Sequence, residues 1–102
     1  MLKKKFLALL LMIMCGASLA LAQITVTGTV VDTSDEPLIG VAVKLQGTQR
    51  AVVTDVNGAY SFKDVPSDGT LLFTYVGMLN QEVKVDGRSA INVTMKDDAQ
   101  RL

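Results

Sequence analysis

The side chains that most often perform catalysis are nearly absent from this chain of 102 residues. It contains no histidine, and its single cysteine, Cys15, lies in an apolar N-terminal segment. Zinc sites built on histidine or cysteine, cysteine–histidine pairs and serine–histidine–aspartate triads are therefore excluded after Cys15. Two carboxylates could still act as a general acid and a general base.

The acidic residues give little support for such a pair, because they lie mostly in predicted turns. Turn formation and solvation explain carboxylates at such positions. The residues concerned are Asp32, Asp35, Glu36, Asp55, Asp64, Asp68 and Asp86. We therefore predict no catalytic residue, no metal ligand and no cofactor, and we expect that the protein is not an enzyme.

Residues 55–58, with the sequence Asp-Val-Asn-Gly, resemble the start of a calcium-binding loop. An EF-hand needs further alternating oxygen ligands and a distal bidentate glutamate, whereas Tyr60 and Phe62 follow here. Asn57 and Gly58 suit the two positive-φ positions of a type I′ turn. We predict a hairpin turn, and weak calcium binding is the alternative.

The elements that must position these residues are short strands. After Gln23, apolar residues alternate with polar ones almost throughout, with turn signals every 8–12 residues or so, which predicts about seven strands in an antiparallel sandwich. The strand over residues 71–76 is apolar on both sides, so we expect it to be central. The expected strands cover residues 24–31, 41–46, 51–54, 60–63, 71–76, 82–86 and 91–95.

The first 22 residues have the layout of a secretory signal peptide. Lys3, Lys4 and Lys5 precede an apolar run, and Ala20 and Ala22 supply small residues at positions −3 and −1 of a cut before Gln23. The hydrophobic segment of about 17 residues is marginal for a permanent membrane span. We predict that residues 1–22 are removed and that the domain works outside the cytoplasm.

Cys15 offers an alternative start, because bacterial lipoproteins are lipidated on a cysteine. Such a signal places a small residue directly before the cysteine, and here Met14 stands there. The cut before Gln23 fits better. A diacylated Cys15 in the mature protein would show that the predicted cut before Gln23 is wrong.

The remaining 80 residues carry seven basic and ten acidic side chains. This weakly acidic composition argues against nucleic-acid binding and against attraction to an anionic membrane. A core of this size rarely supplies more than roughly 3–5 kcal/mol of net stability, and no disulfide can add to it. Stability must come from the sheets or from a larger protein.

Two surfaces could bind a partner. Exposed aromatic residues bind sugars in many exported sandwiches, but Tyr60 and Tyr75 fall in step with Phe62 and Phe73, which favours core packing. The threonine-rich strand over residues 24–31 has few charges to prevent pairing with another chain. The alternative is that a neighbouring strand covers it.

Several segments, in the same order and spacing, resemble carboxypeptidase regulatory-like domains. The segments are TGTVVD at 27–32, EPLIGV at 36–41, VKLQGT at 43–48, TDVNGAYSF at 54–62, LLFTYVG at 71–77, QEVKV at 81–85 and INVTM at 91–95. The resemblance is strongest to the N-terminal extension of starch-utilisation-type TonB-dependent outer-membrane transporters. Met78 departs from the pattern, because the family usually has an aromatic residue there.

The resemblance implies a prealbumin-like (transthyretin-like), immunoglobulin-like sandwich over residues 23–96, with residues 97–102 beginning a linker. It also implies a non-catalytic periplasmic accessory domain of a transporter for a nutrient such as a glycan, an oligosaccharide or a peptide. Its partners would be the transporter's plug and barrel and the TonB system. The chain stops at Leu102, before the expected TonB-box region, so a stand-alone secreted module that binds a glycan or a surface protein is the alternative.

Overall fold

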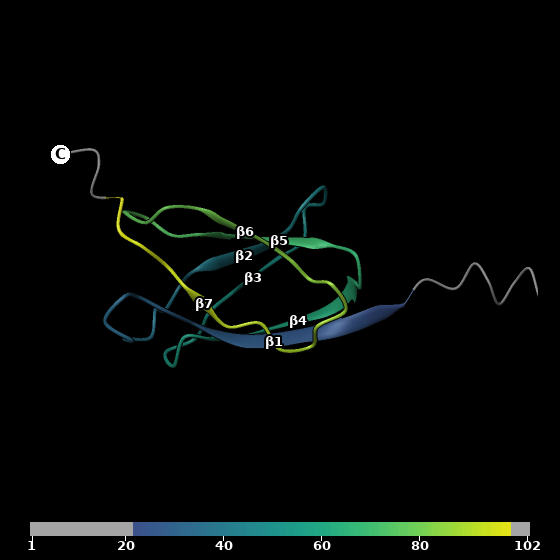
Figure 1. Ribbon diagram of the computed structural model, residues 1–102, viewed down its shortest axis with the longest axis horizontal. Helices are drawn as coiled ribbons and strands as arrows, with labels where there is room; N and C mark the ends of the chain where they lie inside the picture. Colours follow the sequence, from purple (N-terminus) through teal and green to yellow (C-terminus); the bar gives the residue numbers. More distant parts are fainter. Residues whose placement is uncertain (1–21, 99–102) are drawn as a thin grey trace, which may run out of the picture.

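The alternation of apolar and polar residues produces strands that pack as two layers in the computed structural model, which describes residues 22–98 (Figure 1). The predicted all-β sandwich is confirmed, with seven strands in the described part of the chain. The strands are β1 (Gln23–Val31), β2 (Ala42–Leu45), β3 (Ala51–Val53), β4 (Ala59–Pro66), β5 (Thr70–Thr74), β6 (Gln81–Lys84) and β7 (Val93–Thr94).

One sheet has the strand order β4-β1-β7 and the other has the order β3-β2-β5-β6. All pairs of neighbouring strands are antiparallel except β1 and β7, which run parallel with Val30 opposite Val93. The expectation of a purely antiparallel arrangement is wrong for this pair. The physical reason is that β6 lies in the other sheet, so the chain reaches β7 by a crossover and not by a hairpin.

The core lies between the two sheets. On β5, Leu71 and Phe73 point inward and are fully buried, whereas Leu72 points outward and is partly buried. The Phe73 ring meets the Tyr60 ring of the opposite sheet edge-on, with the ring centroids 5.6 Å apart. The interior position predicted for β5 is confirmed, because β2 and β6 flank it. The buried hydrophobic residues are Val26, Val30, Val41, Val43, Leu45, Tyr60, Phe62, Val65, Leu71, Phe73, Val85, Ile91, Val93 and Met95.

The strand β1 is enclosed, which confirms the expectation that a neighbouring strand covers it. β4 pairs with one side of it, and on the other side Thr27 donates its N–H to the Ser89 carbonyl at 2.9 Å and accepts the Ile91 N–H at 2.9 Å. The Met95 N–H donates to the Val31 carbonyl at 2.8 Å. The hypothesis that β1 accepts a foreign strand is therefore wrong, because the C-terminal segment of the same domain occupies that edge.

Tyr60 belongs to the core, as predicted, and its hydroxyl donates to the Ile91 carbonyl at 2.7 Å. This bond joins β4 to the segment that leads into β7. Burial raises the pKa of Tyr60 from 10.0 to about 12, against the opposing effect of the Arg88 charge. A charged phenolate is disfavoured there because it would lose its hydration.

This shift predicts a loss of stability in alkali. Between pH 10 and 12 the folded protein keeps the Tyr60 proton while the unfolded chain loses it. The stability that Tyr60 contributes is therefore complete below pH 10 and is lost as the pH rises towards 12. Denaturant unfolding of the wild type and of Tyr60→Phe should show a difference in unfolding free energy that shrinks over this range. A difference that stays constant would contradict the prediction.

The predicted signal peptide, the alternative lipidation site at Cys15 and most of the predicted linker lie outside the described residues. Within residues 22–98, no helix is long and apolar enough to cross a membrane.

Candidate functional site

The turn at residues 55–58 is built around the Asp55 side chain. Its Oδ1 accepts hydrogen bonds from the backbone N–H groups of Asn57 at 2.9 Å and Ala59 at 3.0 Å. Gly58 has a φ of 71°, whereas Asn57 does not have a positive φ, so the predicted type I′ turn is wrong. The predicted hairpin is also wrong, because the turn joins β3 in one sheet to β4 in the other.

Other acidic side chains also serve the backbone. The Asp32 Oδ1 accepts the N–H groups of Ser34 at 2.8 Å and Glu36 at 3.1 Å, which supports the predicted turn role. Asp64 differs from its prediction, since it lies within β4 with a φ of 57°, where the pairing with β1 shifts register. In the described residues, no group of three or more histidine, cysteine, aspartate or glutamate side chains could hold a metal ion.

The geometry of Asp55 predicts a structural effect without a calcium effect. Asp55→Ala removes two hydrogen bonds and should lower the free energy of unfolding by about 1–2 kcal/mol. Asp68→Ala is the matched control, because Asp68 is also an exposed aspartate in a turn, but its carboxylate does not accept backbone N–H groups as that of Asp55 does. Its effect on the free energy of unfolding should stay within about 0.5 kcal/mol. Thermal unfolding with and without calcium measures both. Calcium stabilisation that disappears in Asp55→Ala would contradict this prediction.

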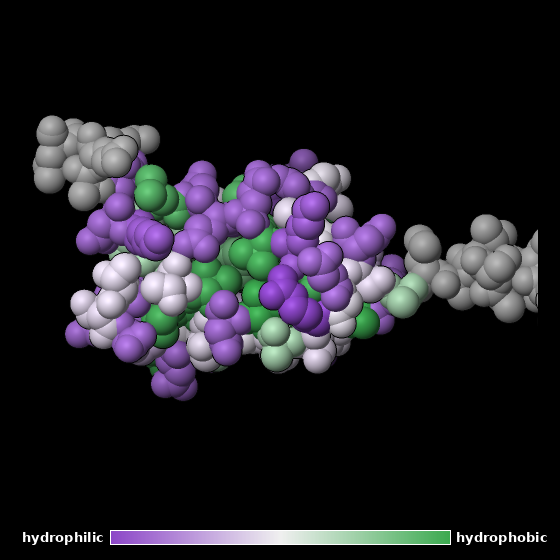
Figure 2. Space-filling view, in the orientation of Figure 1, coloured by the Kyte–Doolittle hydropathy of each residue, from purple (hydrophilic) through white to green (hydrophobic). Residues whose placement is uncertain are grey.

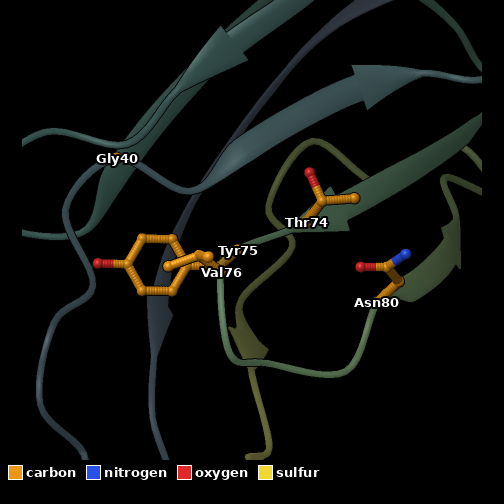
Figure 3. Close-up of a pocket in the computed structure, with 5 residues that line it drawn as sticks. All are labelled: Gly40, Thr74, Tyr75, Val76 and Asn80. Atoms are coloured by element: carbon orange, nitrogen blue, oxygen red, sulfur yellow. The ribbon is translucent and has the colours of Figure 1, made fainter. Parts of the chain in front are cut away.

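A shallow hollow of about 500 Å³ lies at one end of the four-stranded sheet (Figure 3). The Tyr75 ring and Val76 lie beside the loop that carries Gly40, and Thr74 and Asn80 complete the lining. Val76 is 89% exposed. The lining offers apolar contacts, the hydroxyls of Thr74 and Tyr75 and the amide of Asn80, but no carboxylate, amine or guanidinium group. This hollow therefore offers a mixed apolar and polar surface for contact with a partner.

Tyr75 was expected in the core, and the structure places it at the border of the core. It is partly buried, packs against the buried cluster and lines the hollow. The reason is that β5 ends at Thr74, so the opposite sheet no longer covers the side chains that follow. The expectation of complete core packing is thus correct for Tyr60 but not for Tyr75.

A second hollow, of about 530 Å³, lies between β3 and β4, at the side where the edges of the two sheets meet. Arg50 crosses it. Its guanidinium donates to the carbonyls of Lys63 and Asp64 and lies 5.1 Å from the centroid of the Phe62 ring. Arg50 therefore fastens the two sheets together. The sequence contains no local signal for this role, because its partners lie 13 and 14 residues away.

Thr54 holds the loop beside the first hollow. Within residues 22–98 it is the one buried polar side chain, and its Oγ1 accepts the Val41 N–H at 2.9 Å and donates to the Leu38 carbonyl. Its own carbonyl accepts the Gly40 N–H at 3.0 Å. One hydroxyl therefore links both sides of the 38–41 loop to the residue that follows β3.

Thr54→Val keeps the shape of the side chain but leaves the Val41 N–H and the Leu38 carbonyl without their partner. We expect a loss of about 2 kcal/mol in the free energy of unfolding and faster hydrogen exchange at the Val41 amide. Thr54→Ser is the matched control, since it retains the hydroxyl and should lose less. Urea unfolding and NMR hydrogen exchange measure the two effects, and equal losses in both variants would contradict the proposed role of the hydroxyl.

Comparison with known proteins gives the family. Residues 26–102 match the sequence profile of the CarboxypepD_reg-like domain. The chain belongs to this family. The CarboxypepD_reg-like domain is 40% identical over 81 residues to TonB-dependent receptor P39 of Formosa agariphila, covering 79% of this chain and 8% of the receptor. It is 35% identical over 97 residues to TonB-dependent receptor SusC of Bacteroides thetaiotaomicron, covering 91% of this chain and 9% of the receptor.

The chain thus spans less than a tenth of the length of these two relatives. Among solved structures, the CarboxypepD_reg-like domain is similar to a chain of a type II cohesin–X–dockerin complex from Acetivibrio cellulolyticus. The TM-score is 0.59 with 26% identity, covering 72% of this chain and 58% of the other. The two sequence relatives are named as TonB-dependent receptors, and the similar solved chain belongs to a protein–protein complex.

Proposed function

We propose that this CarboxypepD_reg-like domain is a non-catalytic accessory domain of a TonB-dependent outer-membrane nutrient transporter. It acts on the periplasmic side through contacts with protein. The observation that carries the proposal is the 40% identity to TonB-dependent receptor P39, of which a segment of this size is 8%. A domain that makes up so small a part of a transporter contributes to the function of the whole transporter.

The surface chemistry supports contact and not catalysis. The hollow lined by Tyr75 and Val76 contains no carboxylate, amine or guanidinium group. The carboxylates of Asp32 and Asp55 accept backbone N–H groups of their own turns. We propose that the domain orders the segment that leads to the plug and influences engagement of the TonB system, and that it does not carry the nutrient itself.

Deleting residues 24–96 from the full-length transporter tests this role. We expect slower uptake at limiting substrate, while the barrel still assembles in the outer membrane. Heat-modifiable migration on gels reports barrel assembly and separates the two effects. Unchanged uptake at limiting substrate would refute the accessory role.

An antibody against residues 24–96, applied to fractionated cell envelopes, tests the setting of the domain. A large outer-membrane species is the expected result. A small soluble species, periplasmic or secreted, would mean that the domain is a stand-alone binding module. Binding of the purified domain to polysaccharides and surface proteins would then identify its ligand.

A further inference from the structure

The two ends of the sandwich differ in their exposed large hydrophobic side chains, although the end that carries them also carries exposed carboxylates such as Asp35, Glu36 and Asp55. Among the described residues, five large hydrophobic side chains are well exposed, and all five lie at the end where the chain leaves β7. They form what we call the apolar end: Ile39 (53% exposed), Val53 (66%), Val56 (73%), Val76 (89%) and Leu79 (46%). In Figure 2, an apolar group is visible at the upper left, where the C-terminal end of the described chain lies.

Backbone contacts bring these residues to one end although they come from three loops and the end of β3. Thr54 follows Val53, and its carbonyl accepts the N–H of Gly40, the neighbour of Ile39. Gly40 also lines the same hollow as Val76. The turn that carries Val56 is closed at Gly58, whose carbonyl accepts the Val30 N–H beside the same loop.

The opposite end is polar. It is formed by the loops at residues 46–50, 67–69 and 86–90, which contain no large hydrophobic residue. Hydrogen bonds from Gln46 to Thr70, from Gly87 to Ser67 and from Ser67 to Ala22 hold these loops together around the start of β1. In Figure 1, β1 begins at the right-hand end, and the chain leaves β7 towards the upper left. A sandwich surrounded by water on all sides gains nothing from placing all its exposed large hydrophobic residues at one end.

The exit of the chain is fixed to the apolar end. The Leu79 N–H donates to the Lys96 carbonyl at 2.9 Å, and the Asp98 N–H donates to the Gly77 carbonyl at 3.1 Å. Met78 and Asp97 form an antiparallel bridge between these two bonds. Asp98, the last described residue, therefore lies beside the loop that carries Val76 and Leu79.

We propose that the apolar end packs against the part of the same polypeptide that follows this domain, so that the domain stands with its polar end away from the rest of the transporter. This inference rests on the proposed function. The five residues would bury their side chains in this contact, and the bonds of Lys96 and Asp98 to the Gly77–Leu79 loop would set its orientation.

A covalently attached partner suits this surface better than a free one. A stable complex between free proteins uses roughly 20–30 residues on each side, and five exposed hydrophobic residues are far fewer. A short tether raises the effective concentration of its partner to about the millimolar range, so a small apolar contact is sufficient. The hollow between Gly40 and Val76 offers a place for one apolar side chain of that partner.

Photo-crosslinking in the full-length protein in cells tests the contact. Val76 is replaced by p-benzoylphenylalanine in one variant, and Asp68, which is exposed at the polar end, is replaced in the matched control. After irradiation, mass spectrometry should find peptides that join position 76 to residues of the same polypeptide beyond Leu102. Position 68 should give no such peptides. The wild-type protein without the photoreactive residue gives the background.

Each other outcome overturns the inference. Crosslinks from position 76 only to a second copy would mean an interface between copies, and crosslinks only to another protein would mean a separate partner. Equal yields from positions 76 and 68 would mean that the apolar end is uncovered. A small soluble species in the fractionation experiment defeats the proposed function itself. A large species whose uptake depends on residues 24–96, but whose position 76 does not crosslink internally, defeats only this inference.

Discussion

Gly28→Ala should prevent the domain from folding. A Cβ atom at this position of β1 would lie 1.8 Å from the Ile91 carbonyl oxygen and 3.1 Å from Cε1 of Tyr60. The first contact is with backbone, so no change of rotamer relieves it. The Ile91 carbonyl also accepts the Tyr60 hydroxyl, so movement of that carbonyl would break a buried hydrogen bond. We expect the free energy of unfolding to fall by more than about 3 kcal/mol, which is close to the whole stability of a domain of this size.

Circular dichroism and urea unfolding of the purified domain measure this effect. Gly87→Ala is the matched control, because a Cβ atom there meets nothing within 4 Å and the cost comes only from the φ of 72°. That cost should be about 1–2 kcal/mol. A folded Gly28→Ala variant with a loss equal to that of Gly87→Ala would show that the segment around Ile91 can move away from β1.

Phe73→Ala should also greatly lower the free energy of unfolding. Phe73 lies in β5, is fully buried and packs edge-on against Tyr60 of the opposite sheet. Removal of its ring leaves a cavity between the sheets and should cost about 3–5 kcal/mol. Because this variant could unfold completely, Phe73→Leu provides a measurable value, for which we expect less than about 2 kcal/mol.

Leu72→Ala is the control on the same strand, since Leu72 points outward and is only partly buried. For each unit of side-chain volume removed, Leu72→Ala should lower the free energy of unfolding less than either substitution at Phe73. Urea unfolding followed by circular dichroism measures all three variants. If Leu72→Ala cost as much as Phe73→Ala, the outer face of the four-stranded sheet would be covered in solution, which would contradict the assignment of inner and outer faces.

The alternation of apolar and polar residues was sufficient to predict the strands, the sandwich and most of the core. This succeeded because the side-chain period of a strand is a local property, so Val26 and Val30, or Leu71 and Phe73, reveal their shared face from spacing alone. The turn role of Asp32 was predictable for the same reason, since its partners Ser34 and Glu36 lie within four residues.

Strand partners were less predictable, because pairing depends on contacts between residues distant in the sequence. Asn57 and Gly58 have the residue types of a hairpin turn, yet the turn joins two sheets. The threonine-rich β1 has the composition of an open edge, yet the segment at 89–95 covers it. Local sequence specifies a turn or a strand but does not specify which strand lies beside it.

The sequence by itself therefore determined the all-β class, the alternation of faces and the resemblance to carboxypeptidase regulatory-like domains. Only the tertiary structure decided that Arg50 joins the sheets across Phe62 and that Val56, Val76 and Leu79 lie together at the end where the chain leaves β7. In the sequence, an exposed valine in a loop and a buried valine in a strand are the same residue type. Which of them meets solvent depends on where the opposite sheet ends, and the packing of distant segments sets that limit.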